Sequence, residues 1–127
     1  MLYAILCYDS EDVVHAWSKE HNDAVMDRLG AVTSRLAAQG RLGPTARLMP
    51  TTVATTVRKG ATPLVLDGPF AETKEQLLGF YVVDCDSLED ALAVARELGA
   101  ASGTAGAHEV RPLMVFNPST LGEKTPA

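Results

Sequence analysis

The sequence predicts a single α+β domain in which a mainly antiparallel sheet carries two helices on one face. Strand-like apolar runs and two amphipathic stretches follow one another in the order β, α, a β block, β, α, β. The length of 127 residues fits one domain, and 46% hydrophobic with 21% charged residues is typical of a globular chain. With right-handed crossovers, this order gives a ferredoxin-like βαββαβ arrangement with an extra hairpin.

The first strand and the first helix are clearly indicated. Residues 2–8 form an apolar, partly aromatic run that is typical of a strand. Residues 9–18 are expected to form a polar connection, with Ser18 as the helix N-cap. The spacing then predicts a helix from Lys19 to Gln39, because four apolar residues share one helical face. These residues are Val25, Leu29, Val32 and Leu36.

The middle of the chain predicts further strands. Residues 41–47 are a weaker strand candidate because Gly43 and Pro44 interrupt them. Residues 51–58 are rich in Thr and Val, and a short turn links them to residues 63–66. This pair is predicted to form a hairpin.

The second half of the chain predicts one more helix between two strands. Residues 79–84 form the strongest strand candidate. Ser87 begins a helix that Gly99 is expected to end. Residues 108–116 are the last predicted strand, and residues 118–127 are expected to form a loose tail after a domain of residues 1–117.

Both faces of the predicted sheet are apolar. The alternating residues of the strands at 2–8 and 79–84 are largely apolar in each of the two sets. An antiparallel sheet with one wet face normally alternates with polar residues, and two helices cover only one face. We therefore expect a homodimer that packs through the uncovered sheet face.

Composition argues against several classes of protein. The net charge is −5 and the eleven basic residues are scattered, so a nucleic-acid partner is not expected. No apolar stretch approaches the roughly 20 residues of a membrane span. Cys7 and Cys85 are expected to be buried, unpaired thiols of a cytoplasmic protein, with a disulfide or a nucleophile as the alternatives. The spacing of His15, His21 and His108 matches no metal site, and no phosphate-binding loop occurs, so neither metal nor cofactor is expected.

The segment Asp67–Thr73 is the strongest pointer to a functional site. Asp67 ends an apolar run, and Gly68 and Pro69 after it specify a turn. Its carboxylate is expected either to accept backbone N–H groups of that turn or to face an apolar pocket. In a pocket, desolvation raises the pKa of a carboxyl and suits it to general-base catalysis.

Other side chains complete this candidate site. Phe70 is expected in the core or as a lid, and Lys74 could neutralise an anionic ligand. Arg47 is expected to pair with a carboxylate, with anion binding as the alternative. The phenol of Tyr81 is expected to find a local hydrogen-bond partner or a substrate. The candidate catalytic residue is thus Asp67, and the candidate ligand-binding residues are Arg47, Gly68, Pro69, Phe70, Lys74 and Tyr81.

The run Leu66–Leu77, followed by Gly79–Tyr81, resembles the signature of the DGPF-domain branch of the bacterial YCII-related proteins. Residues Leu2–Leu6, Thr51–Arg58 and Glu109–Pro112 are also similar to that branch. The resemblance covers about residues 1–117 and implies a dimeric α+β barrel.

The resemblance also implies two functional hypotheses. Some YCII-like relatives are thought to use a His–Asp pair for acid–base chemistry on small ring compounds, which implies Asp67 as the acid–base residue here. The histidine expected in the first helix falls at Leu29, so His15 or His21 would have to replace it. Members of the branch are also encoded near, or fused to, extracytoplasmic-function sigma factors, which implies a non-catalytic, ligand-sensing partner as the alternative. A purely structural dimerisation module is a third reading.

Overall fold

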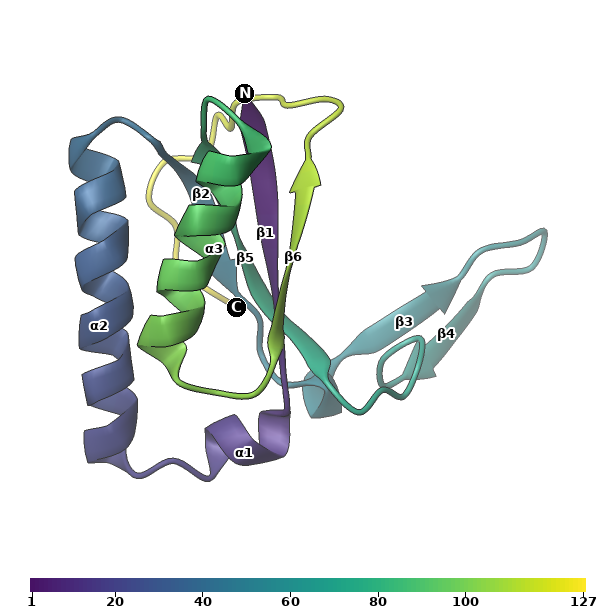
Figure 1. The fold of residues 1–127 in the computed structure, drawn as a ribbon. Coiled ribbons are helices and arrows are strands. Elements are labelled where there is room, and N and C mark those ends of the chain that lie inside the picture. Colours follow the sequence, from purple (N-terminus) through teal and green to yellow (C-terminus); the bar gives the residue numbers. More distant parts are fainter.

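The computed structural model describes residues 1–127, and the ferredoxin-like prediction is confirmed (Figure 1). Four antiparallel strands form the main sheet in the order β2-β5-β1-β6, and the helices α2 and α3 lie against one of its faces. In chain order the elements are β1 (Leu2–Asp9), α1 (Glu11–His15), α2 (Lys19–Ala38), β2 (Leu42–Arg47), η1 (Thr51–Val53), β3 (Thr55–Arg58), β4 (Leu64–Asp67), β5 (Gln76–Asp84), α3 (Leu88–Ser102) and β6 (Ala107–Pro112).

The core lies between the two central strands and the two long helices. Ile5 of β1 is fully buried on the helix-facing side, as is Val83 of β5. Leu36 of α2 and Leu98 of α3 close over them. Burial of each such aliphatic side chain contributes about 1.5–3 kcal/mol, so this layer is a main source of stability.

The connection predicted for residues 9–18 contains a helix that the sequence pattern did not reveal. The hydroxyl of Ser10 caps α1 by accepting a hydrogen bond from the backbone N–H of Val13 at 3.4 Å. Val14 is the one buried residue of this five-residue helix. One buried side chain gives no helical periodicity, and the helix was therefore missed.

Two other predicted boundaries were wrong. The helix α3 continues past Gly99 and ends at Ser102, where Gly103 forms the C-cap with φ of 66°. The last strand ends at Pro112 instead of residue 116. At the other end of α3, the predicted cap is confirmed, since the Ser87 hydroxyl accepts a hydrogen bond from the N–H of Asp90.

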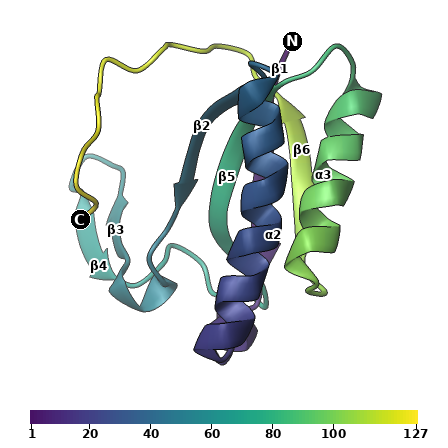
Figure 2. The same cartoon turned by 90° about the vertical axis from the view of Figure 1, so that its left-hand side faces the viewer.

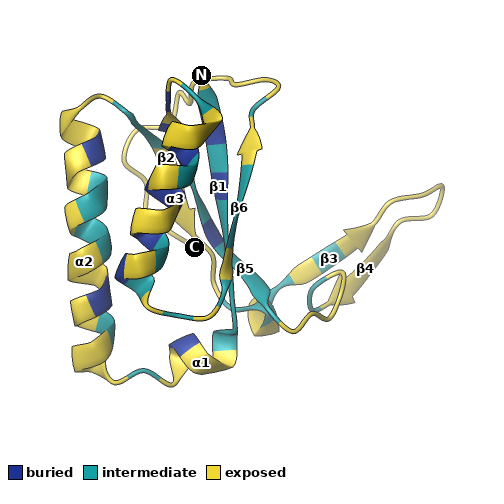
Figure 3. Ribbon diagram, viewed as in Figure 1, coloured by how far each residue is buried: buried dark blue, intermediate teal, exposed yellow.

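Residues 51–74, called the arm below, project from the body of the molecule (Figure 1). Residues 51–53 form a 3-10 turn instead of the predicted strand, and β3 and β4 then pair as a separate two-stranded sheet. Both strands are almost wholly exposed (Figure 3). The carboxylate of Glu11 in α1 holds the root of the arm, because one oxygen accepts the Thr51 N–H at 2.8 Å and the other accepts the Thr51 hydroxyl at 2.7 Å.

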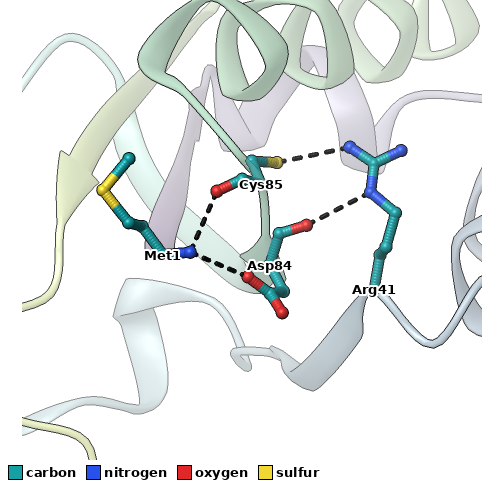
Figure 4. A network of polar contacts seen from close by, with 4 residues as sticks. All are labelled: Met1, Arg41, Asp84 and Cys85. Carbon is teal, nitrogen blue, oxygen red and sulfur yellow. Dashed lines mark hydrogen bonds and ion pairs between the residues drawn. The ribbon is translucent and has the colours of Figure 1, made fainter.

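A polar network joins the ends of three strands (Figure 4), at the opposite end of the sheet from α1 (Figure 1). The ammonium group of Met1 donates to a carboxylate oxygen of Asp84 and to the carbonyl of Cys85, each at 3.0 Å. Arg41 donates to the carbonyl of Asp84 at 3.2 Å and to the sulfur of Cys85 at 3.5 Å. Because the ion pair of Met1 and Asp84 is largely exposed, it contributes at most about 1 kcal/mol.

The face of the sheet away from the helices, called the far face below, has no helical cover. Leu2, Ala4 and Leu6 of β1 are only half-buried there. Residues 113–127 form no helix or strand and run along the side of the molecule away from α3 (Figure 2). None of the helices is both long enough and apolar enough to span a bilayer.

Candidate functional site

A cavity of about 420 Å³ lies between α2 and the helix-facing side of the sheet, at the end of the sheet where α1 sits. Pockets for small molecules usually fall in the range of about 300–1,000 Å³. Eleven of its 19 lining residues are hydrophobic, so most of the wall offers contact to an apolar ring. The large apolar wall residues include Val14, Trp17, Val25, Met26 and Leu29.

The register of the sheet builds the floor of this cavity. His108 of β6, Cys7 of β1, Gly79 of β5 and Arg47 of β2 stand opposite one another in a single row across the four strands. Residues directly opposite each other in a sheet share a face, so all four line the same cavity. Because Gly79 has no side chain, it leaves space for a ligand at the centre of the floor.

Gly79 is also required by the close approach of β2. A Cβ atom at this position would lie 2.2 Å from the carbonyl oxygen of Ala46 and 3.1 Å from the Cα of Arg47. Both are backbone atoms of the neighbouring strand, so a side chain at residue 79 would force the strands apart.

Arg47 lies at the mouth of the cavity without a carboxylate partner. Its guanidinium is exposed and donates only to the sulfur of Met26, at 3.7 Å. None of the four salt bridges of the protein includes it, so the expectation of an ion pair was wrong. A planar guanidinium with free donors is well suited to bind a carboxylate.

Tyr81 brings a hydroxyl group to the same cavity. The residue is half-buried, and its hydroxyl makes no hydrogen bond within the protein, which contradicts the usual behaviour of a partly buried phenol. Burial raises the pKa of Tyr81, the nearby Cys7 raises it further, and Arg47 lowers it. The phenol is therefore protonated at neutral pH and can donate to a ligand.

His108 lines the cavity from the other edge of the sheet. Its ring atom Nδ1 lies 3.1 Å from the carbonyl oxygen of Ala95 in α3. Although β6 is an edge strand, the side chain of His108 is half-buried under α3. The pairing of residues 108 and 7 across β6 and β1 turns the imidazole inward.

Two further ionisable side chains near the floor, Cys7 and Asp9, make hydrogen bonds within the protein. Desolvation by burial, together with the negative charge of Asp9, raises the pKa of the Cys7 thiol to about 11. Its sulfur donates to the carbonyl of Ile5 at 3.8 Å. Asp9 accepts hydrogen bonds from the N–H of Ser10 and from the hydroxyl of Thr104. Both cysteines are unpaired, as predicted, although Cys7 is only partly buried.

The structure divides the predicted site residues into two groups. Arg47 and Tyr81 meet at the cavity. The other five predicted residues belong to the arm and line neither this cavity nor the smaller one of about 200 Å³ beside His108. They are Asp67, Gly68, Pro69, Phe70 and Lys74.

Within the arm, the carboxylate of Asp67 is exposed and accepts no hydrogen bond from its turn. The turn is held instead by the backbone: the Gly68 N–H donates to the carbonyl of Ala54 at 2.8 Å, and the Thr56 hydroxyl donates to the carbonyl of Gly68 at 2.7 Å. Gly68 has φ of 99°, which favours glycine. Phe70 is 76% exposed, so within one chain it belongs neither to the core nor to a lid.

The other two histidines do not line the cavity. His15 and His21 are exposed, and the ring of His21 packs edge-on against Trp17 with centroids 4.8 Å apart. Leu29, where the family resemblance led us to expect a histidine, does line the cavity. No group of three or more His, Cys, Asp or Glu side chains is arranged to hold a metal ion.

Comparison with known proteins agrees with the family suggested by the sequence. Residues 1–117 match the model of the YCII-related domain. An uncharacterised protein of Rhizobium meliloti strain 1021 is 55% identical over 122 residues, which is 95% of this chain and 98% of that protein.

Among solved structures, the fold is similar to that of 5-chloro-2-hydroxyhydroquinone dehydrochlorinase from Burkholderia phenoliruptrix AC1100, in complex with 2,5-dihydroxybenzoquinone. The TM-score is 0.51 with 15% identity, over 89% of this chain and 93% of the other, so this likeness concerns the fold alone. On the match to the family model and the close relative, the chain belongs to the YCII-related family.

Proposed function

We propose that this protein binds a small cyclic organic anion in the cavity between α2 and the sheet. The observation that carries this proposal is the guanidinium of Arg47, which has no carboxylate partner and stands at the mouth of an apolar cavity of about 420 Å³. An anion supplies the missing partner, and the apolar walls favour the ring that carries it.

The hydroxyl of Tyr81 supports a ligand with a polar substituent. It is protonated at neutral pH and has no partner in the protein, so it can donate to an oxygen on the ring. The structural neighbour from Burkholderia acts on a hydroxylated ring compound, which supports a ring-shaped ligand here. The proposed ligand class is therefore a small aromatic or cyclic carboxylate.

Cofactor-free acid–base chemistry on such a ligand is the catalytic form of this proposal. Within one chain, Asp67 and Lys74 lie on the arm and outside the cavity. They take part in chemistry there only if the arm of a second subunit reaches the site. The non-catalytic form is a ligand sensor that acts on a regulatory partner such as a sigma factor.

We also propose that a second copy of the chain covers the far face and the arm. The accessible surface of 8960 Å² exceeds by about 2,400 Å² the roughly 6,500 Å² of a compact monomer of 13.5 kDa. A standard interface buries about 800 Å² on each partner. The excess is ample for a dimer, and the exposed apolar residues of the arm are suited to its interface: Val57, Leu64, Val65, Leu66 and Phe70.

Binding of benzoate and related ring carboxylates, measured by calorimetry, tests the ligand proposal. We expect Arg47→Gln to weaken binding about tenfold or more, because a hydrogen bond to a charged group contributes about 1.5–3 kcal/mol. Arg96→Gln is the matched control, since Arg96 is exposed on α3 and lies outside both cavities. Equal affinity in the two variants, or no binding of any ring carboxylate, would refute the proposal.

The fate of the bound molecule separates the two forms of the proposal. Product detected by mass spectrometry, and lost in Asp67→Asn, supports acid–base catalysis. Saturable binding without product, together with co-purification of a sigma factor, supports the sensor.

A further inference from the structure

We propose that His108 is the hydrogen-bond acceptor that selects the ligand, and that the preferred ligand is a ring carboxylate with a hydroxyl group opposite its carboxylate. This inference rests on the proposed function, since it concerns the same cavity. It assigns the ligand's two polar ends to two named residues, Arg47 and His108.

The hydrogen bond to α3 fixes which ring nitrogen of His108 is free. The carbonyl oxygen of Ala95 can only accept, so Nδ1, at 3.1 Å from it, carries the hydrogen and donates. In the neutral ring, Nε2 then holds a lone pair and acts as an acceptor.

Nε2 is also open to a ligand. It makes no hydrogen bond within the protein. Every side-chain nitrogen or oxygen that is closed to solvent in a residue that is not exposed has a hydrogen-bond partner, so Nε2, which has none, is accessible to solvent. His108 lines both the larger cavity and the smaller one of about 200 Å³, and the proposal places the free lone pair of Nε2 in the larger one.

Other polar groups near this end of the floor already make hydrogen bonds within the protein. Both carboxylate oxygens of Asp9 receive hydrogen bonds, from Ser10 and Thr104. The thiol of Cys7 stays protonated and donates to Ile5. Among these groups, Nε2 of His108 is the one that makes no hydrogen bond within the protein, and the proposal therefore assigns the ligand's hydroxyl group to it.

The row across the sheet sets the relative position of the two ligand-binding groups. Arg47 and His108 stand at its two ends, separated by three strand spacings, or roughly 14 Å between Cα atoms. Cys7 and Gly79 lie between them and form the floor under a flat ring. This placement favours a molecule whose anionic group and hydroxyl group are on opposite sides of the ring.

A ligand whose ring has no hydroxyl group removes water from Nε2 without replacing its hydrogen bond. The unsatisfied acceptor then weakens the binding of that ligand. A net contribution of about 0.5–1.5 kcal/mol per hydrogen bond corresponds to roughly a twofold to tenfold preference for the hydroxylated ligand. The probes are 4-hydroxybenzoate and benzoate, and the quantity measured is the ratio of their dissociation constants by calorimetry.

Two substitutions test separately the donor role of Nδ1 and the acceptor role of Nε2. His108→Asn keeps an amide donor near the position of Nδ1 and removes the acceptor at Nε2. His108→Gln places an amide oxygen near Nε2 and removes the donor to Ala95. We expect wild type and His108→Gln to prefer 4-hydroxybenzoate, and His108→Asn to bind both acids about equally well.

A preference that persists in His108→Asn overturns this inference and leaves the proposed function intact. Absence of binding of both acids to wild type overturns this inference, and absence of binding of every ring carboxylate tested overturns the proposed function with it. The nitrogen resonances of His108 in the wild-type protein give a second measurement that needs no folded variant. The Nε2 resonance should shift with 4-hydroxybenzoate and much less with benzoate, and equal shifts would contradict the assignment.

Discussion

The thiol of Cys7 lies in an environment that disfavours its ionised form. Burial and the neighbouring Asp9 raise its pKa from 9.0 to about 11. Because the unfolded chain loses this proton first, the stabilising contribution of Cys7 is complete below pH 9 and disappears as the pH rises toward 11. We expect the free energy of unfolding of wild type to fall more steeply over this range than that of Cys7→Ala, as measured by urea titration.

The same residue gives a kinetic check. Since the thiolate is the nucleophile, alkylation of Cys7 in the folded protein should be slow at pH 8 and should accelerate up to about pH 11. Urea-unfolded protein is the control, and its alkylation should follow an ordinary cysteine. A midpoint near pH 9 in the folded protein would contradict the raised pKa of Cys7.

At the scale of elements, two glycines of the cavity wall have opposite roles. Gly79→Ala brings a Cβ to within 2.2 Å of the Ala46 carbonyl, so β2 must move, and we expect a loss of about 1–3 kcal/mol in the free energy of unfolding. Gly30→Ala in α2 meets no atom within 4 Å and should add about 0.5–1 kcal/mol, because alanine favours a helix.

Chemical denaturation of both glycine variants checks this pair. A Gly79→Ala protein as stable as wild type would show that β2 can move away from β5 without cost. A loss of stability in Gly30→Ala would show that the space beside α2 is filled.

The helices and central strands were predictable because their signals are local. The apolar spacing from Val25 to Leu36 sets a helical period, and the prediction for α2 differs from the structure by one residue at its end. The helix α1 has no such period. The helix α3 passes Gly99 and ends before Gly103, which has the left-handed φ of 66° that suits a C-cap. A glycine in a helix costs only about 1 kcal/mol, which the packing of α3 offsets.

At the scale of the whole molecule, the arm is the feature that one chain leaves most exposed. Val65 in β4 is 69% exposed, and a hairpin of this length is at best marginally stable in water by itself. If a second copy covers the arm, Val65→Lys should shift the protein from dimer to monomer, because the interface would then bury an unpaired charge. Light scattering coupled to size-exclusion chromatography measures this shift.

The control for the arm is Val13→Lys. Val13 is 52% exposed on α1 and lies outside the exposed hairpin of β3 and β4, and this substitution should leave the mass unchanged. A monomeric wild type, or equal masses for the two variants, would rule out the proposed cover of the arm.

The candidate site was less predictable than the fold because the pairing register of the strands decides which residues line the cavity. Arg47 and Tyr81 were named from the sequence, but the row that places Arg47 opposite Gly79 and His108 opposite Cys7 depends on how distant strands align. The turn after β4, which carries the motif that begins at Asp67, is held by hydrogen bonds within the arm. Within one chain, the motif that is sharply defined in sequence forms a turn of the arm, while the cavity is formed by residues with no shared motif.

The bond between Glu11 and Thr51 has a mechanical consequence. The helix that carries Glu11 also contributes Val14 to the cavity wall, and Thr51 is the first residue of the arm. A displacement of that helix by an occupant of the cavity must either pull the hairpin along or break two hydrogen bonds at once. The carboxylate of Glu11 thus couples the wall of the cavity to the arm.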